Sequence, residues 1–216
     1  KLHSFLKKWL DTKIFDELNS LLKLKSINSV NTQIRALSYQ LYENNGVVKR
    51  EEVLDIIKDL SQDERKTLRN LGVKFGRYHI FLFKLFKPNV VSLRILLWKN
   101  FNGEDLNLHP PTFGLNFVND IKYKNKKFML LCGFEKFDSF FVRIDILERL
   151  FIEIINSNEI KSEKIKLIPK MLNLLGCNKE SFVKVIKLMG YKVFDEKSET
   201  FFKYKPFKKI KKSLDL

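Results

Sequence analysis

The chain has 216 residues, of which 44% are hydrophobic, and a formal net charge of +16 at pH 7. This length and apolar content suffice for one folded domain or two small ones. None of its apolar runs approaches the roughly eighteen residues that a membrane span requires, so the composition excludes a membrane-spanning helix and predicts no membrane partner.

The predicted elements of the first half are mostly helices. Apolar residues at helical spacing between Leu2 and Leu22 predict a first amphipathic helix, and a second is expected over 31–45. The pair at 47–48 fits a short strand, and a third helix is expected over 49–60. A fourth, over 61–72, begins at capping-box spacing and ends at a glycine.

The stretch at 73–87 mixes cations with aromatic residues and fits either a helix or a strand. Pro88 then suits the first turn of a helix over 88–101. The turn-rich segment "NGEDLNLHPPTFG" at 102–114 predicts a loop.

The second half is less regular. "KKFMLLCGFEKF" suggests a helix end or a strand, and firm helical patterns follow at 145–156, 162–175 and 179–189. "YKVF" and "TFFKYK" flank a charged turn and predict a closing hairpin. "CGFEKFD" at 132–138 is similar to "MGYKVFD" at 189–195, but one repeat of seven residues is weak evidence for duplication.

These elements predict a mainly α fold: a helical, bundle-like region with a few short strands or a closing hairpin. The expected division is a helical region over 1–101, a loop or linker over 102–127, and a smaller α+β region over 128–216 that ends in a basic tail. Because the chain begins with Lys1 rather than Met, it is expected to be part of a longer polypeptide.

The charge favours a nucleic-acid partner, because cationic side chains that bind phosphates release condensed counterions and so favour binding. Only eight of the 41 basic residues are arginine, however, and the chain is rich in Lys, Asn, Ile and Phe. AT-rich coding produces the same bias, so charge alone leaves both explanations open. The two cysteines, Cys132 and Cys177, lie far apart and fit buried thiols in a reducing compartment.

Catalytic motifs are scarce. None of the eight glycines is followed by lysine, so a phosphate-cradling P-loop is missing from the sequence. His3, His79 and His109 have no cysteine or carboxylate cluster at metal spacing around them. Asp145 and Glu148 beside Arg149 fit a surface salt-bridge network better than an acid–base pair. The chain by itself is therefore expected to have no catalytic residues, no metal and no cofactor.

The most informative stretch is "VKFGRYHIFLFKLFKPNVVSLRILLW" at 73–98. Cations and hydrogen-bonding aromatics precede Ile80, and apolar aromatics follow it. We expect 81–86 to be core, and the preceding 74–79 to be an exposed lip that contacts nucleic acid by stacking and phosphate neutralisation. Trp98, in an apolar helix, is expected to be buried.

The segment "LRNLGVKFGRYHIFLFKLFKPNVVSLRILLW" at 68–98 resembles a stretch near the end of superfamily II helicases related to the mitochondrial RNA-degradosome helicase, and is most similar to alphaproteobacterial members. The segments at 35–53, 142–150 and 174–193 resemble their flanking regions in the same order. One departure is Phe83, where the family usually has proline.

The resemblance implies a helical region that follows the two motor lobes of an ATP-dependent helicase and helps to enclose a single strand of RNA or DNA. ATP and Mg²⁺ would belong to the motor lobes of the same polypeptide, in a bacterial cytoplasm, with a nuclease as a further partner. The motif suggests Lys74, Arg77, Tyr78 and His79 as nucleic-acid contacts, and position in the sequence adds Arg69, Lys84 and Lys87.

Two other functions remain open. The chain fits a structural module that docks on the motor or on a partner protein without touching nucleic acid. It also fits a DNA-binding regulator, because 35–83 reads as a helix-turn-helix with a wing. No helix there has the short polar residues with arginine that read base edges, which disfavours the regulator.

Overall fold

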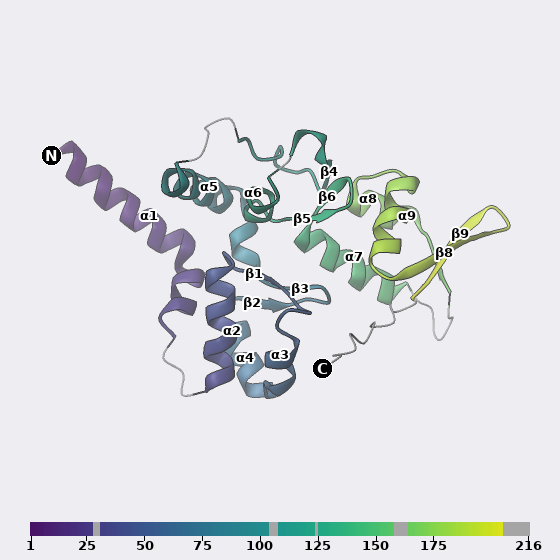
Figure 1. Cartoon of the computed structure of the whole chain (residues 1–216), viewed down its shortest axis with the longest axis horizontal. Helices are drawn as coiled ribbons and strands as arrows, with labels where there is room; N and C mark the ends of the chain where they lie inside the picture. Colours follow the sequence, from purple (N-terminus) through teal and green to yellow (C-terminus); the bar gives the residue numbers. More distant parts are fainter. Residues whose placement is uncertain (28–30, 104–107, 124, 158–163, 205–216) are drawn as a thin grey trace, which may run out of the picture. The chain divides into compact units, whose positions relative to one another are not determined.

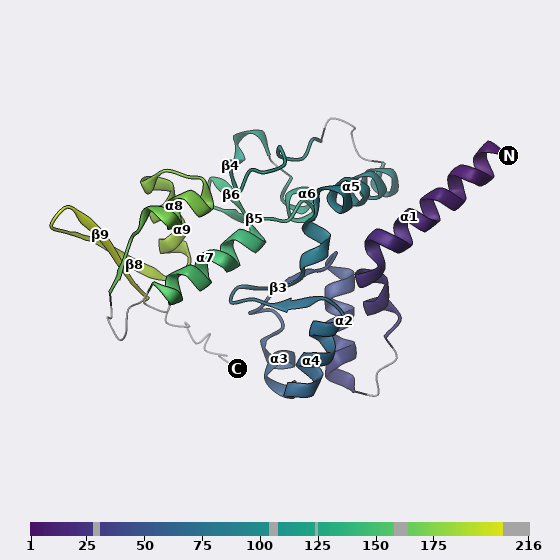
Figure 2. The same cartoon turned by 180° about the vertical axis from the view of Figure 1, so that it is seen from behind.

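The computed structural model describes residues 1–27, 31–103, 108–123, 125–157 and 164–204. The chain divides into two compact units, Lys1–Glu148 and Arg149–Leu216. The described part is mainly helical with short antiparallel strands, which confirms the expected class (Figures 1 and 2). The division lies inside helix α7 (Ile144–Asn156) and not in the expected linker at 102–127.

The first unit opens with two helices, α1 (Leu2–Lys25) and α2 (Thr32–Glu43). The side chain of Asn31 caps α2 by accepting a hydrogen bond from the backbone N–H of Gln33 at 2.7 Å. Leu18 and Leu24 of α1 are buried in the same core as the inner face of α2. The first nine residues of the chain, by contrast, are all exposed.

A helix-turn-helix followed by a β-hairpin comes next. The elements are β1 (Val47–Lys49), α3 (Leu54–Asp59), α4 (Gln62–Asn70), β2 (Val73–Phe75) and β3 (His79–Leu82). Only two residues join α3 to α4, and the sheet order is β1-β3-β2. This connectivity is that of a winged helix, with the hairpin as the wing. The ambiguous stretch at 73–87 is thus two strands followed by the 3-10 helix η1 (Phe83–Phe86).

The same order of elements recurs twice. After α5 (Pro88–Asn102), the second copy consists of β4 (Phe117–Asn119), η2 (Asp120–Lys122), α6 (Lys126–Leu131), β5 (Phe134–Phe137) and β6 (Phe140–Arg143). After α7, the third consists of β7 (Ile165–Lys166), α8 (Pro169–Leu175), α9 (Lys179–Leu188), β8 (Tyr191–Glu196) and β9 (Glu199–Tyr204). Their sheet orders, β4-β6-β5 and β7-β9-β8, match the first. We call these segments the first, second and third repeats.

The repeats share the backbone geometry that joins their last helix to the hairpin. Gly72, Gly133 and Gly190 have φ values of 95°, 89° and 90°, a left-handed conformation that glycine adopts without strain. The residue four positions before each glycine is fully buried; these residues are Leu68, Met129 and Ile186. The side chains of Ser61, Asn125 and Asn178 cap the three helices. The short similarity between 132–138 and 189–195 therefore reflects a structural repeat, and 71–76 is its third member.

Each sheet has an inner face, which packs on its own helices, and an outer face. In the first repeat, Val73 and Ile80 of the inner face lie in the large core with α2 and α4. Phe81 of the outer face belongs to a smaller cluster with Val47, Phe86 and Ile144. The outer face of this sheet is thus covered within the first unit.

A buried arginine ties the first and second repeats together. The Arg94 guanidinium of α5 donates hydrogen bonds to the backbone oxygens of Leu85 at 3.3 Å, Leu131 at 3.1 Å and Asn45 at 2.6 Å. Burial lowers the pKa of Arg94 to about 10, which keeps it charged at neutral pH. One buried side chain thus joins three backbone segments of the first unit.

Several sequence-based expectations need correction. The helix expected over 49–60 is formed only at 54–59. Within the segment expected to be helical over 162–175, strand β7 lies at 165–166 and helix α8 at 169–175. Phe83 lies within the predicted core segment but is 46% exposed. Trp98 is half-buried at the edge of a core cluster, with its ring 5.7 Å from that of Phe128. Small antiparallel sheets accompany the helices in the described segments, and the first repeat has the connectivity of a winged helix.

Candidate nucleic-acid interface

The seven predicted contact residues are spread over several elements of the first unit. They are Arg69 in α4, Lys74 in β2, Arg77 and Tyr78 in the hairpin turn, His79 in β3, Lys84 in η1, and Lys87 at the N-cap of α5. The five long cations are exposed and Tyr78 is half-buried. His79 is only 3% exposed, so the expectation that the whole of 74–79 forms an open lip is wrong for this residue.

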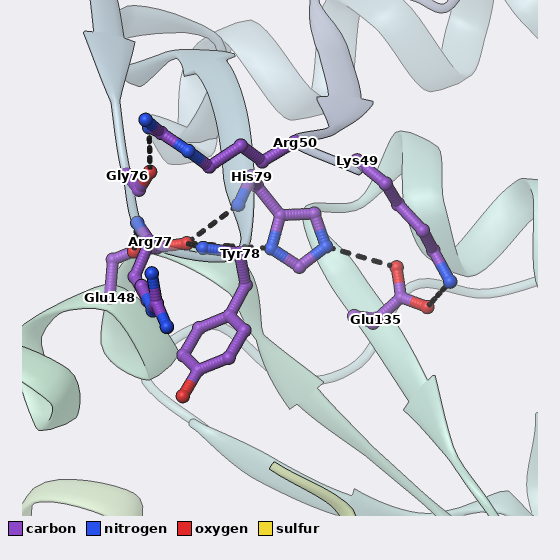
Figure 3. Close-up of polar contacts among 8 residues, drawn as sticks. All are labelled: Lys49, Arg50, Gly76, Arg77, Tyr78, His79, Glu135 and Glu148. Carbon is purple, nitrogen blue, oxygen red and sulfur yellow. Dashed lines mark hydrogen bonds and ion pairs between the residues drawn. The ribbon is translucent and has the colours of Figure 1, made fainter. Parts of the chain in front are cut away.

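The hairpin turn wraps around a carboxylate from α7. Glu148 accepts hydrogen bonds from the backbone N–H groups of Arg77 at 2.5 Å, Tyr78 at 2.9 Å and His79 at 2.8 Å (Figure 3). A Cβ atom at Gly76 would lie 2.4 Å from the carboxyl carbon of Glu148, so a larger residue there would displace this carboxylate from the turn. Successive N–H groups of a turn form a natural cradle for an anion, and here the protein supplies the anion itself.

Arg50 holds the same turn from its other side. Its guanidinium Nη1 donates to the backbone oxygen of Gly76 at 2.9 Å, and its backbone N–H donates to the oxygen of Tyr78 at 2.9 Å. The turn is therefore fixed by partners from α7 and from Arg50, the residue that follows β1. The exposed side chain of Arg77 is carried on a rigid support.

Behind the turn, His79 lies between two buried carboxylates. Its Nε2 is 3.3 Å from Glu135 Oε2, and its Nδ1 is 3.6 Å from Glu148 Oε1. Lys49 Nζ lies 3.1 Å from the other oxygen of Glu135. Figure 3 shows these side chains as one connected group, which we call the buried polar cluster: Lys49, His79, Glu135 and Glu148.

The cluster shifts the ionisation of its members. Burial alone lowers the pKa of His79, but the hydrogen bond to Glu135 and the charges of Glu135 and Glu148 outweigh it, so this pKa is raised. Burial raises the pKa of Glu135, but His79 and Lys49 outweigh it, so the carboxyl pKa is lowered. The pKa of Lys49 is raised because Glu135 outweighs the effect of its burial. Lys49 and His79 thus favour the charged form of Glu135, and Glu135 favours theirs.

The predicted contacts do not form one surface. The Arg69 guanidinium lies 5.5 Å from the ring centre of Phe75, a residue of the inner face. Lys74 pairs across the strands with Phe81 and therefore points to the outer face. Arg69 and Lys74 are accordingly on opposite sides of the sheet, and His79 serves the buried polar cluster instead of the surface.

The sequence reasoning missed one candidate cation, Lys66. It is exposed on α4, one turn before Arg69, so the two cations share a helix face. A signal existed in the sequence, because a lysine stands six residues before the hairpin glycine in all three repeats: Lys66, Lys127 and Lys184. The signal becomes visible only once the three repeats are aligned on these glycines.

Other site chemistry has little support in the described segments. Among those residues no group of three or more His, Cys, Asp or Glu side chains is placed to hold a metal ion. Burial raises the pKa of the Cys132 thiol to about 12 and that of Cys177 to about 11, so neither is an activated nucleophile. None of the helices within the described ranges has the length and apolarity needed to cross a membrane.

Comparisons with protein-family models, with curated proteins and with solved structures give no match to this chain. The arrangement of helix-turn-helix, wing and exposed cations is therefore the basis on which its function is inferred.

Proposed function

We propose that this chain is a non-catalytic accessory region of an ATP-dependent RNA or DNA helicase, which contacts single-stranded nucleic acid and packs on the motor lobes. The observation that carries the proposal is the first repeat, where Lys66 and Arg69 are exposed on the last helix of a helix-turn-helix. Such modules present that helix to nucleic acid. The net charge of +16 adds a general attraction for a polyanion.

The rigid turn is the second part of the proposed interface. Because Glu148 and Arg50 fix the backbone of the turn, the Arg77 side chain is presented with less loss of conformational entropy on binding. Lys74, Lys84 and Lys87 contribute further exposed charge, and half-buried Tyr78 lies in the same turn as Arg77. Contacts of this kind neutralise phosphates without reading base sequence.

ATP and Mg²⁺ have no assigned residues in this chain and belong, in this proposal, to the motor lobes of a bacterial cytoplasmic helicase. A nuclease is a further proposed partner. The predicted basic tail at 205–216 lies outside the described residues, so its part in binding is a matter for experiment.

The test measures binding of a fluorescein-labelled single-stranded 20-mer by fluorescence anisotropy at several salt concentrations. Lys66→Ala with Arg69→Ala, and separately Lys74→Ala with Arg77→Ala, should weaken binding. Each lost phosphate contact should flatten the log–log salt dependence by about 0.7. Tyr78→Ala should weaken binding by roughly 1–3 kcal/mol if a base stacks on its ring, with an unchanged slope.

The matched control is Lys126→Ala with Lys127→Ala, which removes two exposed cations from the equivalent helix of the second repeat. This helix has Leu130 in place of Arg69, so the control should bind like the unmodified chain. If the control and the first-repeat variants lose affinity equally, binding depends on total charge and not on this interface. Loss of binding only on Lys208→Ala with Lys209→Ala would assign it to the tail.

One feature favours the second candidate function, a docking module without nucleic-acid contact. Along the first turns of α1, an apolar row at helical spacing is strongly exposed: Leu2 72%, Phe5 67%, Leu6 51% and Trp9 56%. Large exposed apolar rows commonly mark a protein interface. A chain that binds no oligonucleotide at low salt, and whose self-association falls on Phe5→Ser with Trp9→Ser, would favour this function.

A further inference from the structure

The outer face of the third repeat's sheet differs from its counterparts in the first two repeats. On the central strands, the equivalent outer positions are deeply buried in those repeats: His79 is 3% and Phe81 4% exposed, and Phe140 is 2% and Val142 0% exposed. In the third repeat these positions are Phe201, which is half-buried, and Lys203, which is exposed. The third outer face is thus the open one among the described sheets.

Two aromatic rings lie side by side on this open face. Phe194 of β8 and Phe201 of β9 are paired across the strands, with ring centres 6.2 Å apart and planes inclined by 14°. Both side chains are half-buried although they point away from the core formed by Phe182, Tyr191 and Phe202. The tip of the β8–β9 hairpin extends beyond α8 and α9 in both views (Figures 1 and 2).

Lysines surround the two rings. Lys192 and Lys203 are directly opposite each other across the strands, and Lys166 of β7 pairs with Phe201. The ammonium group of Lys164 lies 5.1 Å from the ring centre of Phe194. Two glutamates at the hairpin tip are bound by lysines: Lys164 to Glu196 at 2.6 Å and Lys166 to Glu199 at 2.5 Å. The remaining balance of charge on the face is positive.

Lys192 and Lys203 place two positive charges at directly opposed positions beside the two rings. A ligand that has both negative charge and flat apolar rings complements all of these features. Single-stranded nucleic acid has phosphates and unpaired bases at neighbouring positions, and binds to surfaces that combine cations with aromatic side chains.

We propose that the outer face of the β7-β9-β8 sheet is a binding surface for single-stranded nucleic acid, in which a base stacks on Phe194 and Phe201 while Lys192 and Lys203 contact phosphates. The inference rests on the proposed role in nucleic-acid binding. It assigns that role to a second surface, in a different compact unit and with different residues. Phosphates and unpaired bases, which RNA and DNA have in common, are the groups that this surface would contact.

The test compares variants of the full chain by fluorescence anisotropy with two labelled probes, a uridine 20-mer of RNA and a thymidine 20-mer of DNA. Phe194→Leu with Phe201→Leu keeps the apolar character of the hairpin but removes the rings. The dissociation constant should rise at least about fivefold, with an unchanged salt slope. Lys192→Ala with Lys203→Ala should flatten the salt slope by about 1.4, since two phosphate contacts are lost.

The matched control is Lys170→Ala, an exposed lysine of α8 in the same compact unit whose partner is Glu153 at 2.9 Å. This variant should change the affinity and the salt slope only as much as the loss of one positive charge outside the binding surface would. Thermal melting of each variant, followed by circular dichroism, shows whether the hairpin is intact. A difference between the two probes tells whether RNA or DNA is preferred.

A second measurement needs no substitution. Photocrosslinking with a 5-iodouracil 20-mer, followed by mass spectrometry, should attach the probe to the peptide that contains Phe194 or Phe201. If the crosslinks fall only on the first repeat and the third-repeat variants bind normally, this inference is wrong and the proposed function stands. If the third-repeat variants alone lose affinity, the interface of the first repeat is wrong. An unmodified chain that binds neither probe contradicts both proposals.

Discussion

At the scale of single residues, Glu148 has the largest structural consequence. Its two oxygens satisfy three successive backbone donors of a turn about 70 positions earlier in the chain, and it lies beside His79 in the buried polar cluster. Hydrogen bonds to a charged group contribute about 1.5–3 kcal/mol to stability, and buried donors that lose their partner are costly. The carboxylate therefore fixes both the turn and the histidine behind it.

Glu148→Gln should lower the free energy of unfolding by about 3 kcal/mol, because a neutral amide with one acceptor oxygen replaces a carboxylate that serves three donors. Urea unfolding followed by circular dichroism measures the change. The control is Glu51→Gln at an exposed position of the first repeat, which should be nearly neutral. Equal stability of the two variants would show that the turn does not depend on Glu148.

The buried polar cluster also predicts a pH dependence. The pKa of His79 is raised above 6.5 in the folded chain, so its stabilisation is complete below pH 6.5 and is lost as the pH rises through the folded value. The pKa of Glu135 is lowered below 4.5, so its stabilisation is present above pH 4.5 and is lost as the pH falls through its folded value. The cluster should therefore stabilise the protein most between these two limits.

His79→Gln should remove the alkaline part of this dependence. The melting temperature of the unmodified chain should fall more steeply between pH 6 and pH 9 than that of the variant, as measured by differential scanning fluorimetry. His109→Gln, at an exposed position, should keep the steeper profile. Parallel profiles for the unmodified chain and the His79 variant would mean that the histidine is not charged in the fold.

The sequence could predict part of this site but not its role. The mixture of cations and aromatics at 74–79 predicted an exposed segment, and Lys74 and Arg77 in it are exposed. The burial of His79 was not predictable, because it depends on Glu135 and Glu148, which lie 56 and 69 positions away. Glu148 itself resembled a surface residue, since Arg149 beside it suggested a salt-bridge network.

At the scale of elements, short local sequence signals correctly predicted where the capped helices begin. Ser61 and Glu64 predicted α4 and form the expected capping box, and Pro88 opens α5. The strands of the first and second hairpins were left open between helix and strand, because they are only three or four residues long, too short for a period of two to stand out. The closing hairpin, with six residues in each strand, was predicted correctly.

The glycines that join each last helix to its hairpin should be sensitive to substitution by different amounts. Gly72→Ala makes only an ordinary van der Waals contact, with Leu82 at 3.8 Å, and should cost about 1–2 kcal/mol, from the left-handed backbone alone. Gly133→Ala should cost more, because a Cβ atom there would lie 2.9 Å from the ring of Phe86. Chemical denaturation should rank the two variants in this order.

Gly103→Asn provides the reference for this series. Gly103 has a φ of 59° at the end of α5 and nothing within reach of an added Cβ, and asparagine tolerates this conformation. The substitution should be almost neutral. If Gly133→Ala is as mild as Gly103→Asn, the proposed close contact with Phe86 is relieved by movement of the ring.

At the scale of the whole chain, three copies of one arrangement follow each other along the sequence. The three repeats share a left-handed backbone conformation at Gly72, Gly133 and Gly190. This conformation requires few other residue types, so only seven residues of similarity are visible in the sequence. Side chains at equivalent positions have diverged. Lys74 and Lys192 are exposed, whereas Glu135, their equivalent in the second repeat, is buried against His79.

The isolated chain should hydrolyse no ATP, with or without a single-stranded oligonucleotide, because its sequence contains no phosphate-cradling loop. A coupled assay for ADP release on chromatographically pure protein measures this. Turnover that follows the protein through a second, independent column would contradict an accessory role. Addition of the oligonucleotide is the necessary control, since helicase motors respond to it.

The attachment of the first hairpin to Glu148 also affects the order of events during synthesis. The turn at 76–78 leaves the ribosome about 70 residues before the carboxylate that binds its three N–H groups. At about 5–20 residues per second, this delay is roughly 4–14 s. During this time the turn of the first repeat lacks the carboxylate that accepts its hydrogen bonds. The fold of the first repeat is therefore completed only when a later part of the chain has been synthesised.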